Sequence, residues 1–202
     1  MDAMRIQAPA ARGGRFGSER LRTILVLVVV GIALLGVAVL VEQPWANDGF
    51  TNVTLPDGAA AAAPAVGATA PDFKTTTIDG TPVSLSEYQG QPVWLTFGAS
   101  WCPDCRGEAP DLQATYEKYA AQGLVVLSVN IQEDEKAVRD YAERVGLTFT
   151  QIADPSTIIA GRYRIMGVPT HYFISPEGTI EQVRLGGLPP AEMESLVQSI
   201  IQ

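Results

Sequence analysis

Cys102 and Cys105 are the only thiols among the 202 residues, and two residues separate them. Thiols at this spacing could close a disulfide within one helical turn or supply half of a metal site. A structural zinc site needs about four ligands, whereas the chain has one histidine and no third cysteine. A purely structural disulfide across so short a loop would stabilise the fold little, because the gain depends on loop length. The spacing therefore favours redox exchange.

The residues around the two cysteines predict a strand that leads into a helix. Residues 92–97 form an apolar, strand-favouring run, residues 98–100 predict a turn, and residues 106–121 predict a helix. Cys102 is therefore expected at the opening turn of a helix, where free N–H groups and the helix dipole favour a thiolate. Such positions lower a cysteine pKa from about 8.5 to roughly 3.5–7.5. We expect Cys102 to be the more exposed sulfur and to attack, and Cys105 to resolve.

This segment resembles the active site of the thioredoxin superfamily, and a second motif strengthens the resemblance. Residues 167–170, Gly-Val-Pro-Thr, follow about 65 residues later and resemble the cis-proline loop that faces the dithiol in that superfamily. A proline can take the rare cis form and has no N–H to donate. The resemblance implies that the backbone at Val168 and Pro169 binds a substrate peptide, and that Trp101 shapes the surface that substrates meet. A plain turn proline before a strand is the alternative.

Within the superfamily, the chain resembles membrane-anchored extracytoplasmic thiol–disulfide reductases of the TlpA/ResA kind over about residues 64–202. Residues 70–85 resemble their N-terminal hairpin, and residues 105–110 match their Cys-x-x-Glu-x-Pro continuation. The chain also departs from these relatives. Asp104 occupies the place before the second cysteine where that family commonly has proline, and Thr96 replaces the buried aspartate of thioredoxin itself.

Glu108 is the candidate replacement for that missing acid. It lies three residues after Cys105, and residues at this spacing share a helix face. A partly buried carboxylate there could exchange a proton with Cys105, although its charge would also raise the thiol pKa values. The alternative is a solvated helix glutamate without a catalytic role. His171, the only histidine, is expected to be a packed strand residue rather than a metal ligand or catalytic base.

The N-terminal residues predict a membrane anchor. Residues 23–41 carry no charge, and this length suffices to span a bilayer as a helix. Five arginines precede this run against two acidic residues, which places the N-terminus in the cytoplasm by the positive-inside rule. A cleavable signal peptide is the alternative. We therefore expect a cytoplasmic segment (1–22), a transmembrane anchor (23–41), a flexible Ala/Pro/Gly-containing tether (42–66) and a thioredoxin-like domain (67–202).

The remaining pattern predicts one α/β domain of the thioredoxin-like fold, with a mixed central sheet flanked by helices. The sequence predicts strands at 92–97, 124–130, 149–152, 170–174 and 179–185, and helices at 106–121, 133–145, 156–163 and 191–201. The net charge of −8 argues against binding a phosphate backbone, so no nucleic-acid partner is expected.

Together these features predict a membrane-anchored, extracytoplasmic protein-disulfide reductase that uses Cys102 and Cys105 and needs no cofactor or metal. The family resemblance implies an exported protein such as apocytochrome c as substrate and a membrane thiol–disulfide protein as electron donor. A monomer is expected. Two alternatives remain: a copper-binding assembly factor for a respiratory oxidase, and a peroxiredoxin-type peroxidase. The peroxidase is disfavoured because Ala99 stands where peroxiredoxins need a threonine.

Overall fold

The computed structural model describes residues 16–41 and 63–201, which belong to two units, Met1–Asp48 and Gly49–Gln202. Most of the expected cytoplasmic segment (residues 1–15 of 1–22) and most of the expected tether (residues 42–62 of 42–66) lie outside the described residues.

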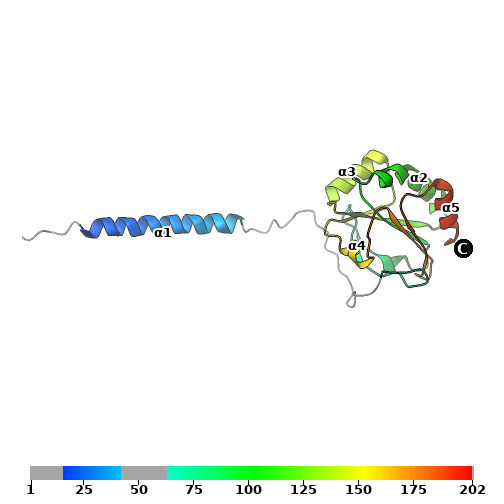
Figure 1. The fold of residues 1–202 in the computed structure, drawn as a ribbon, viewed down its shortest axis with the longest axis horizontal. Helices are drawn as coiled ribbons and strands as arrows, with labels where there is room; N and C mark the ends of the chain where they lie inside the picture. Colours follow the sequence, from blue (N-terminus) through cyan, green and yellow to red (C-terminus); the bar gives the residue numbers. More distant parts are fainter. Residues whose placement is uncertain (1–15, 42–62, 202) are drawn as a thin grey trace, which may run out of the picture. The chain divides into compact units, whose positions relative to one another are not determined.

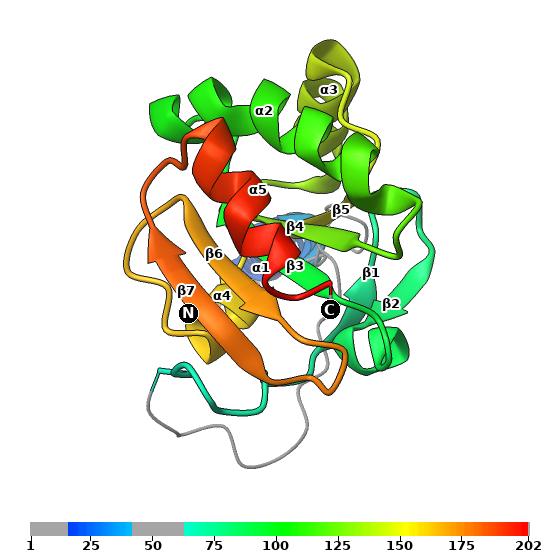
Figure 2. The same cartoon turned by 90° about the vertical axis from the view of Figure 1, so that its right-hand side faces the viewer.

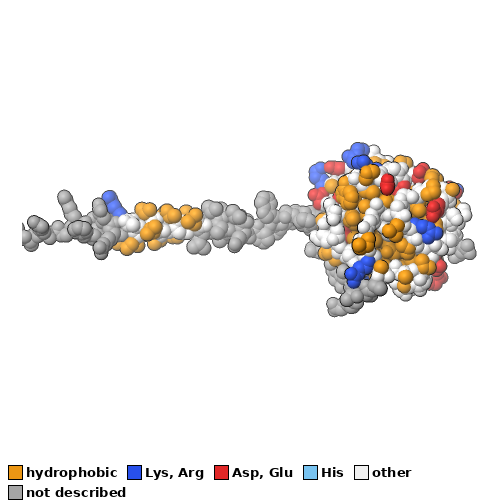
Figure 3. Space-filling view, in the orientation of Figure 1, with side chains coloured by type: hydrophobic (Ala, Val, Ile, Leu, Met, Phe, Trp, Pro, Cys, Tyr) orange, Lys and Arg blue, Asp and Glu red, His pale blue; other side chains and the backbone are white. Residues whose placement is uncertain are grey.

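The described residues of the first unit form the helix α1 (Phe16–Val41) (Figure 1). Its described side chains are mostly hydrophobic and exposed, among them Leu25 and Leu27, and hydrophobic atoms cover much of the side in view in Figure 3. No helix in the described part of the chain combines the length and the apolar character needed to cross a membrane.

The second unit is built on a five-stranded mixed sheet with the order β5-β4-β3-β6-β7 (Figure 2). Strands β3, β4 and β5 are parallel, whereas β6 and β7 run antiparallel to their neighbours. The thioredoxin-like mixed sheet expected from the sequence is therefore confirmed. The strands are β3 (Val93–Gly98), β4 (Val125–Ile131), β5 (Thr150–Asp154), β6 (Thr170–Ile174) and β7 (Ile180–Leu185).

Helices cover both faces of this sheet. Three of them lie on one face and one short helix lies on the other (Figure 2). A separate hairpin and a 3-10 turn precede β3 and complete the domain. The elements are α2 (Pro103–Ala120), α3 (Glu135–Val145) and α5 (Pro190–Gln198) on the first face, α4 (Ile158–Arg162) on the second, the hairpin β1 (Lys74–Thr76) and β2 (Pro82–Ser84), and the turn η1 (Leu85–Tyr88).

The two faces of the sheet differ in chemistry. Side chains alternate along β3, so Leu95 and Phe97 pack against Ile159 of α4 in an apolar core, while Trp94 faces α2 and α5. The face under α2 and α3 also carries buried polar side chains. These are Thr96, Ser128, Asn130, Gln151 and His171. The amide of Asn130 donates to Gln151 Oε1 at 3.0 Å, so part of this polar layer satisfies itself.

Asp154 ends β5 and anchors the helix that follows it. Its fully buried carboxylate accepts the N–H of Ile158 at 2.8 Å and that of Ala160 at 2.9 Å. These N–H groups belong to the first turn of α4 and have no partner within the helix. Asp154 thereby fixes the start of the segment that leads to residues 163–169.

We predict that Asp154→Asn lowers the free energy of unfolding by about 1–2 kcal/mol, because the amide places an NH2 group, which can only donate, opposite one of the two N–H donors. Burial raises the pKa of Asp154, so the folded state binds this proton more tightly than the unfolded state. The carboxyl group's contribution to stability is therefore greatest below its unfolded-state pKa of about 4. It falls as the pH rises through the higher pKa of the folded state. Chemical denaturation at several pH values should show wild type losing its advantage over the variant across that window. An advantage that grew with pH would contradict this reasoning.

Candidate active site

Cys102 stands at the N-cap of α2, directly after the turn that follows β3. Its Sγ accepts the backbone N–H of Cys105 at 3.2 Å, and Pro103 occupies the first helical turn, where a missing N–H has no consequence. The two cysteines form a disulfide with 5.3 Å between their Cα atoms. The Cys102 sulfur therefore lies at the positive end of the helix dipole and accepts an N–H that has no partner within the helix. Both features stabilise a thiolate.

Contrary to expectation, Cys102 is not the more exposed of the two cysteine residues. Cys102 is 4% exposed and Cys105 is 9% exposed. The physical reason is the neighbouring loop, because the Val168 carbonyl oxygen lies 3.6 Å from Cys102 Sγ and the Val168 side chain packs against the dithiol cluster. The assignment of Cys102 as the attacking sulfur therefore depends on its helix-cap position and not on its exposure.

The loop over Cys102 contains a cis peptide bond between Val168 and Pro169, as the resemblance implies. Strand β6 runs antiparallel to β3 with Phe97 opposite Thr170, so the start of β6 lies beside the end of β3. This pairing brings the loop and the dithiol to the same edge of the sheet, although 66 residues separate Cys102 from Val168.

The turn before the dithiol is held by a buried carboxylate that the sequence analysis missed. Glu133 follows β4 and is 7% exposed. Its Oε2 accepts the backbone N–H of Ser100 at 2.7 Å, and its Oε1 accepts the Ser100 hydroxyl. The signal that could have revealed it is an acidic residue just after a buried strand, at the sheet edge where β3 also ends.

Glu108 is buried beneath the dithiol, at 7% exposure, so the alternative of a solvated helix glutamate is wrong. Its Oε2 accepts the backbone N–H of Leu188 at 3.0 Å, and its Oε1 lies 3.4 Å from Nε2 of His171. Asp104, in contrast, is exposed. Of the two acidic residues next to the cysteines in the sequence, only Glu108 is therefore buried.

A small pocket of about 30 Å³ lies beside Cys105 and Glu108, between α2, α3 and the sheet. Cys105, Glu108, Asn130 and Tyr141 are among its lining residues, and the volume suffices for about one water molecule. The buried Tyr141 hydroxyl has no hydrogen-bond partner among the described residues, and burial raises the pKa of Tyr141. The side chain therefore stays a neutral hydroxyl at neutral pH.

An open groove of about 510 Å³ lies beside the dithiol and ends at the cis-proline loop. Trp101, Met166 and Val168 line it, with Trp101 49% exposed and Met166 92% exposed. Exposed apolar side chains of this size indicate a surface that contacts another molecule. Two of the three predicted substrate-binding residues, Trp101 and Val168, thus line one opening, and the third, Pro169, directly follows Val168 in the chain.

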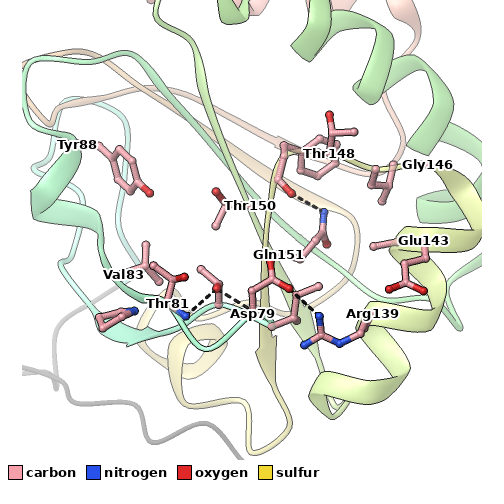
Figure 4. Close-up of a pocket in the computed structure, with 16 residues that line it drawn as sticks. Asp79, Thr81, Val83, Tyr88, Arg139, Glu143, Gly146, Thr148, Thr150 and Gln151 are labelled. Carbon is pink, nitrogen blue, oxygen red and sulfur yellow. Dashed lines mark hydrogen bonds and ion pairs between the residues drawn. The ribbon is translucent and has the colours of Figure 1, made fainter.

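A second hollow of about 480 Å³ lies elsewhere, between the β1–β2 hairpin and the C-terminal end of α3 (Figure 4). Arg139 bonds Asp79 across it, and Thr148, Thr150 and Gln151 contribute polar side chains. Neither cysteine lines this hollow. The cysteines lie instead at the end of β3, where Cys105 lines the smaller pocket and Trp101, the neighbour of Cys102, lines the groove.

Comparison with known proteins agrees with this geometry. Residues 66–183 match the AhpC/TSA family. The chain is 36% identical to thiol-disulfide oxidoreductase ResA of Geobacillus kaustophilus over 136 residues, which is 67% of this chain and 78% of that protein. It is 32% identical to ResA of Geobacillus thermodenitrificans over 180 residues, or 89% of this chain and 94% of that protein.

Solved structures show the same likeness. A thiol:disulfide interchange protein of the thioredoxin family from Chlorobium tepidum is 28% identical and superposes with a TM-score of 0.61. The match covers 68% of this chain and 99% of that chain. With the dithiol at a helix cap, the cis-proline loop above it and these relatives, the chain belongs to the AhpC/TSA family, among the thioredoxin-like thiol–disulfide oxidoreductases related to ResA.

Proposed function

We propose that this protein reduces disulfides in exported proteins. The observation that carries the proposal is the Cys102–Cys105 disulfide at the start of α2, facing the cis-proline loop and the apolar groove. A two-cysteine pair in this position can exchange with a partner disulfide without a bound cofactor. The groove supplies a surface on which a polypeptide can lie while its sulfur meets Cys102.

The reaction begins from the reduced form. The Cys102 thiolate attacks one sulfur of the partner disulfide, a new S–S bond joins Cys102 to the partner, and the partner's other sulfur leaves as a thiolate that takes up a proton. Cys105 loses its proton and attacks Cys102, which breaks the mixed disulfide and releases the second partner thiol. The partner gains two electrons, and the Cys102–Cys105 pair loses them.

Glu108 is placed to accept the Cys105 proton in the second step. It shares the small pocket with Cys105, and no other carboxylate lines that pocket. A general base must lie within hydrogen-bond reach of its proton, directly or through one water, and the pocket suits the second arrangement. Glu108 therefore takes the role that a buried aspartate has at the position of Thr96 in thioredoxin itself.

We also propose where the enzyme acts and which proteins it exchanges electrons with. The uncharged run 23–41 after an arginine-rich segment supports an N-terminal anchor that leaves the thioredoxin-like domain outside the cytoplasm. An apocytochrome c is the proposed substrate, and a membrane thiol–disulfide protein is the proposed electron donor to a monomeric enzyme. Comparing the membrane and soluble fractions of the full chain with those of a chain lacking residues 1–41 tests the anchor, and equal solubility would contradict it.

Two alternative functions have weaker support. A copper-binding assembly factor would use thiolate sulfur for Cu(I), but His171 is fully buried, and the described residues contain no group of three or more His, Cys, Asp or Glu placed to hold a metal ion. A copper titration with a spectroscopic readout distinguishes this function from disulfide reduction. A peroxidase would need an activating hydroxyl three residues before Cys102, where the structure has the buried Ala99.

The direction of the reaction can be read from the reduction potential of the Cys102–Cys105 pair. A reductase should have a potential near or below that of thioredoxin, about −270 mV. The exposed charge of Asp104 favours this outcome, because it opposes the thiolate that makes strong oxidants oxidising. Equilibration with a glutathione or dithiothreitol redox buffer measures it. A value near −120 mV would instead identify an oxidase.

Replacing each cysteine should separate the two steps. Cys102→Ser should abolish disulfide reduction, because no sulfur remains at the helix cap. Cys105→Ser should retain the first attack and accumulate mixed disulfides with Cys102. Expressing Cys105→Ser in the native host and identifying the linked proteins by mass spectrometry names the partners, with the double variant as control. Wild-type reduction rates in both single variants would remove the dithiol from the mechanism.

Glu108→Gln tests the proposed base. The variant is nearly isosteric and should fold, yet the second step should slow by at least about 100-fold if general-base catalysis is lost. Removing the nearby negative charge should also lower the thiol pKa values. Thiolate absorbance and alkylation rate against pH measure both effects, with the exposed Asp104→Asn as the control for a charge change on the same helix. If neither curve moved, Glu108 would be a structural residue only.

A further inference from the structure

His171 lies in the middle of β6, fully buried, between Trp94 and Glu108. The indole Nε1–H of Trp94 donates to Nδ1 of His171 at 3.3 Å. On the other side of the ring, Nε2 lies 3.4 Å from Glu108 Oε1. From the sequence, His171 is expected only as a packed strand residue, whereas in the structure it links the Trp94 indole to the buried Glu108 carboxylate.

The Trp94 contact decides which ring nitrogen carries the proton. An indole N–H can only donate, so Nδ1 must present its lone pair. A neutral imidazole with an unprotonated Nδ1 carries its proton on Nε2. That proton points toward Glu108. A proton on Nδ1 would set two donors against each other in a buried site.

Within the described part of the chain, Glu108 is the one group that lies close to the Nε2–H of His171. Among the described residues Nε2 makes no geometrically proper hydrogen bond, and the 3.4 Å contact with Glu108 meets only the distance of an ion pair. Contacts in resting enzymes are often longer than those in the reacting complex. Arg184 pairs with His171 across β6 and β7, and its guanidinium binds Glu192 of α5 at 3.1 Å.

We propose that His171 is a positioning residue for Glu108. Its Nε2–H, fixed in that tautomer by Trp94, orients the carboxylate when Glu108 accepts the Cys105 proton, while the Leu188 N–H holds the second oxygen. The inference rests on the proposed thiol–disulfide exchange. Trp94, His171 and Glu108 then act as an ordered chain in which each group fixes the orientation of the next.

The tautomer can be read directly, because the chain has a single histidine. Nitrogen-15 NMR of the oxidised full-length protein at neutral pH should show Nε2 protonated and Nδ1 unprotonated. Trp94→Phe keeps an aromatic ring against Phe173 but removes the donor, so both tautomers should become populated. Tyr172→Phe is the matched control, because its hydroxyl donates to Tyr163 and not to His171. An Nδ1-protonated wild type, or no change in Trp94→Phe, would overturn the proposal.

Two variants at position 171 test the effect on catalysis. A glutamine amide can place an N–H where Nε2 stands, whereas the shorter asparagine amide reaches only the position of Nδ1. With dithionitrobenzoate as substrate, each step releases one coloured thiolate, so both rates are visible. His171→Asn should slow the second release by about tenfold, the effect of losing one hydrogen bond to a charged group. His171→Gln should stay within about threefold of wild type, and the first release should be unchanged in both.

The outcomes separate this inference from the proposed function. Equal second-step rates in the Asn and Gln variants, with a normal first step, would overturn the positioning role and leave thiol–disulfide exchange intact. Failure of wild type to form any mixed disulfide would overturn the proposed function and the positioning role with it. Urea denaturation of both variants identifies a general loss of stability, which should be similar in the two and so cannot produce the expected difference.

Discussion

The contact between Cys102 Sγ and the Cys105 N–H is the interaction on which the site depends. A helix needs a group to accept the first of its free N–H donors, and side-chain oxygens usually supply it. Here the reactive sulfur is the acceptor. The same contact that ends the turn and starts α2 therefore places negative charge where the helix favours it. Structure and reactivity share one hydrogen bond, so a change in the turn geometry would alter both.

The rest of the domain supports this contact from three directions. Glu133 holds the backbone of Ser100 before the cysteines, and the Val168–Pro169 loop covers Cys102 from above. Glu108 lies below, held by the Leu188 N–H. Each supporting group comes from a different part of the chain, and the mixed sheet brings them together because β4, β6 and the loop after β7 all approach the end of β3. Inside the domain, buried polar side chains between α2 and the sheet line the pocket that holds Glu108.

Local patterns predicted much of this fold. The apolar run 92–97, the turn and the helix after it were found with ends shifted by at most three residues, and the expected mixed sheet flanked by helices is present. The exposure of Cys102 was predicted wrongly because Val168, which covers it, is distant in sequence. The burial of Glu108 depends on Leu188, 80 residues away, and on His171. Such contacts arise from strand pairing over long separations and leave no periodic trace in the sequence.

The way the chain enters the domain has a mechanical consequence. Residues 67–70 bond to the turn before β7, through Gly67 with Ile180 and Ala70 with Gly178. That turn follows Ile174, which pairs with Val93 at the beginning of β3, whereas the dithiol follows the end of β3. A strand of six residues separates the two points by roughly 20 Å. A force applied through residue 67 would therefore act on the end of the sheet opposite the reactive sulfurs. The turn that carries the sulfurs would not bear this force directly.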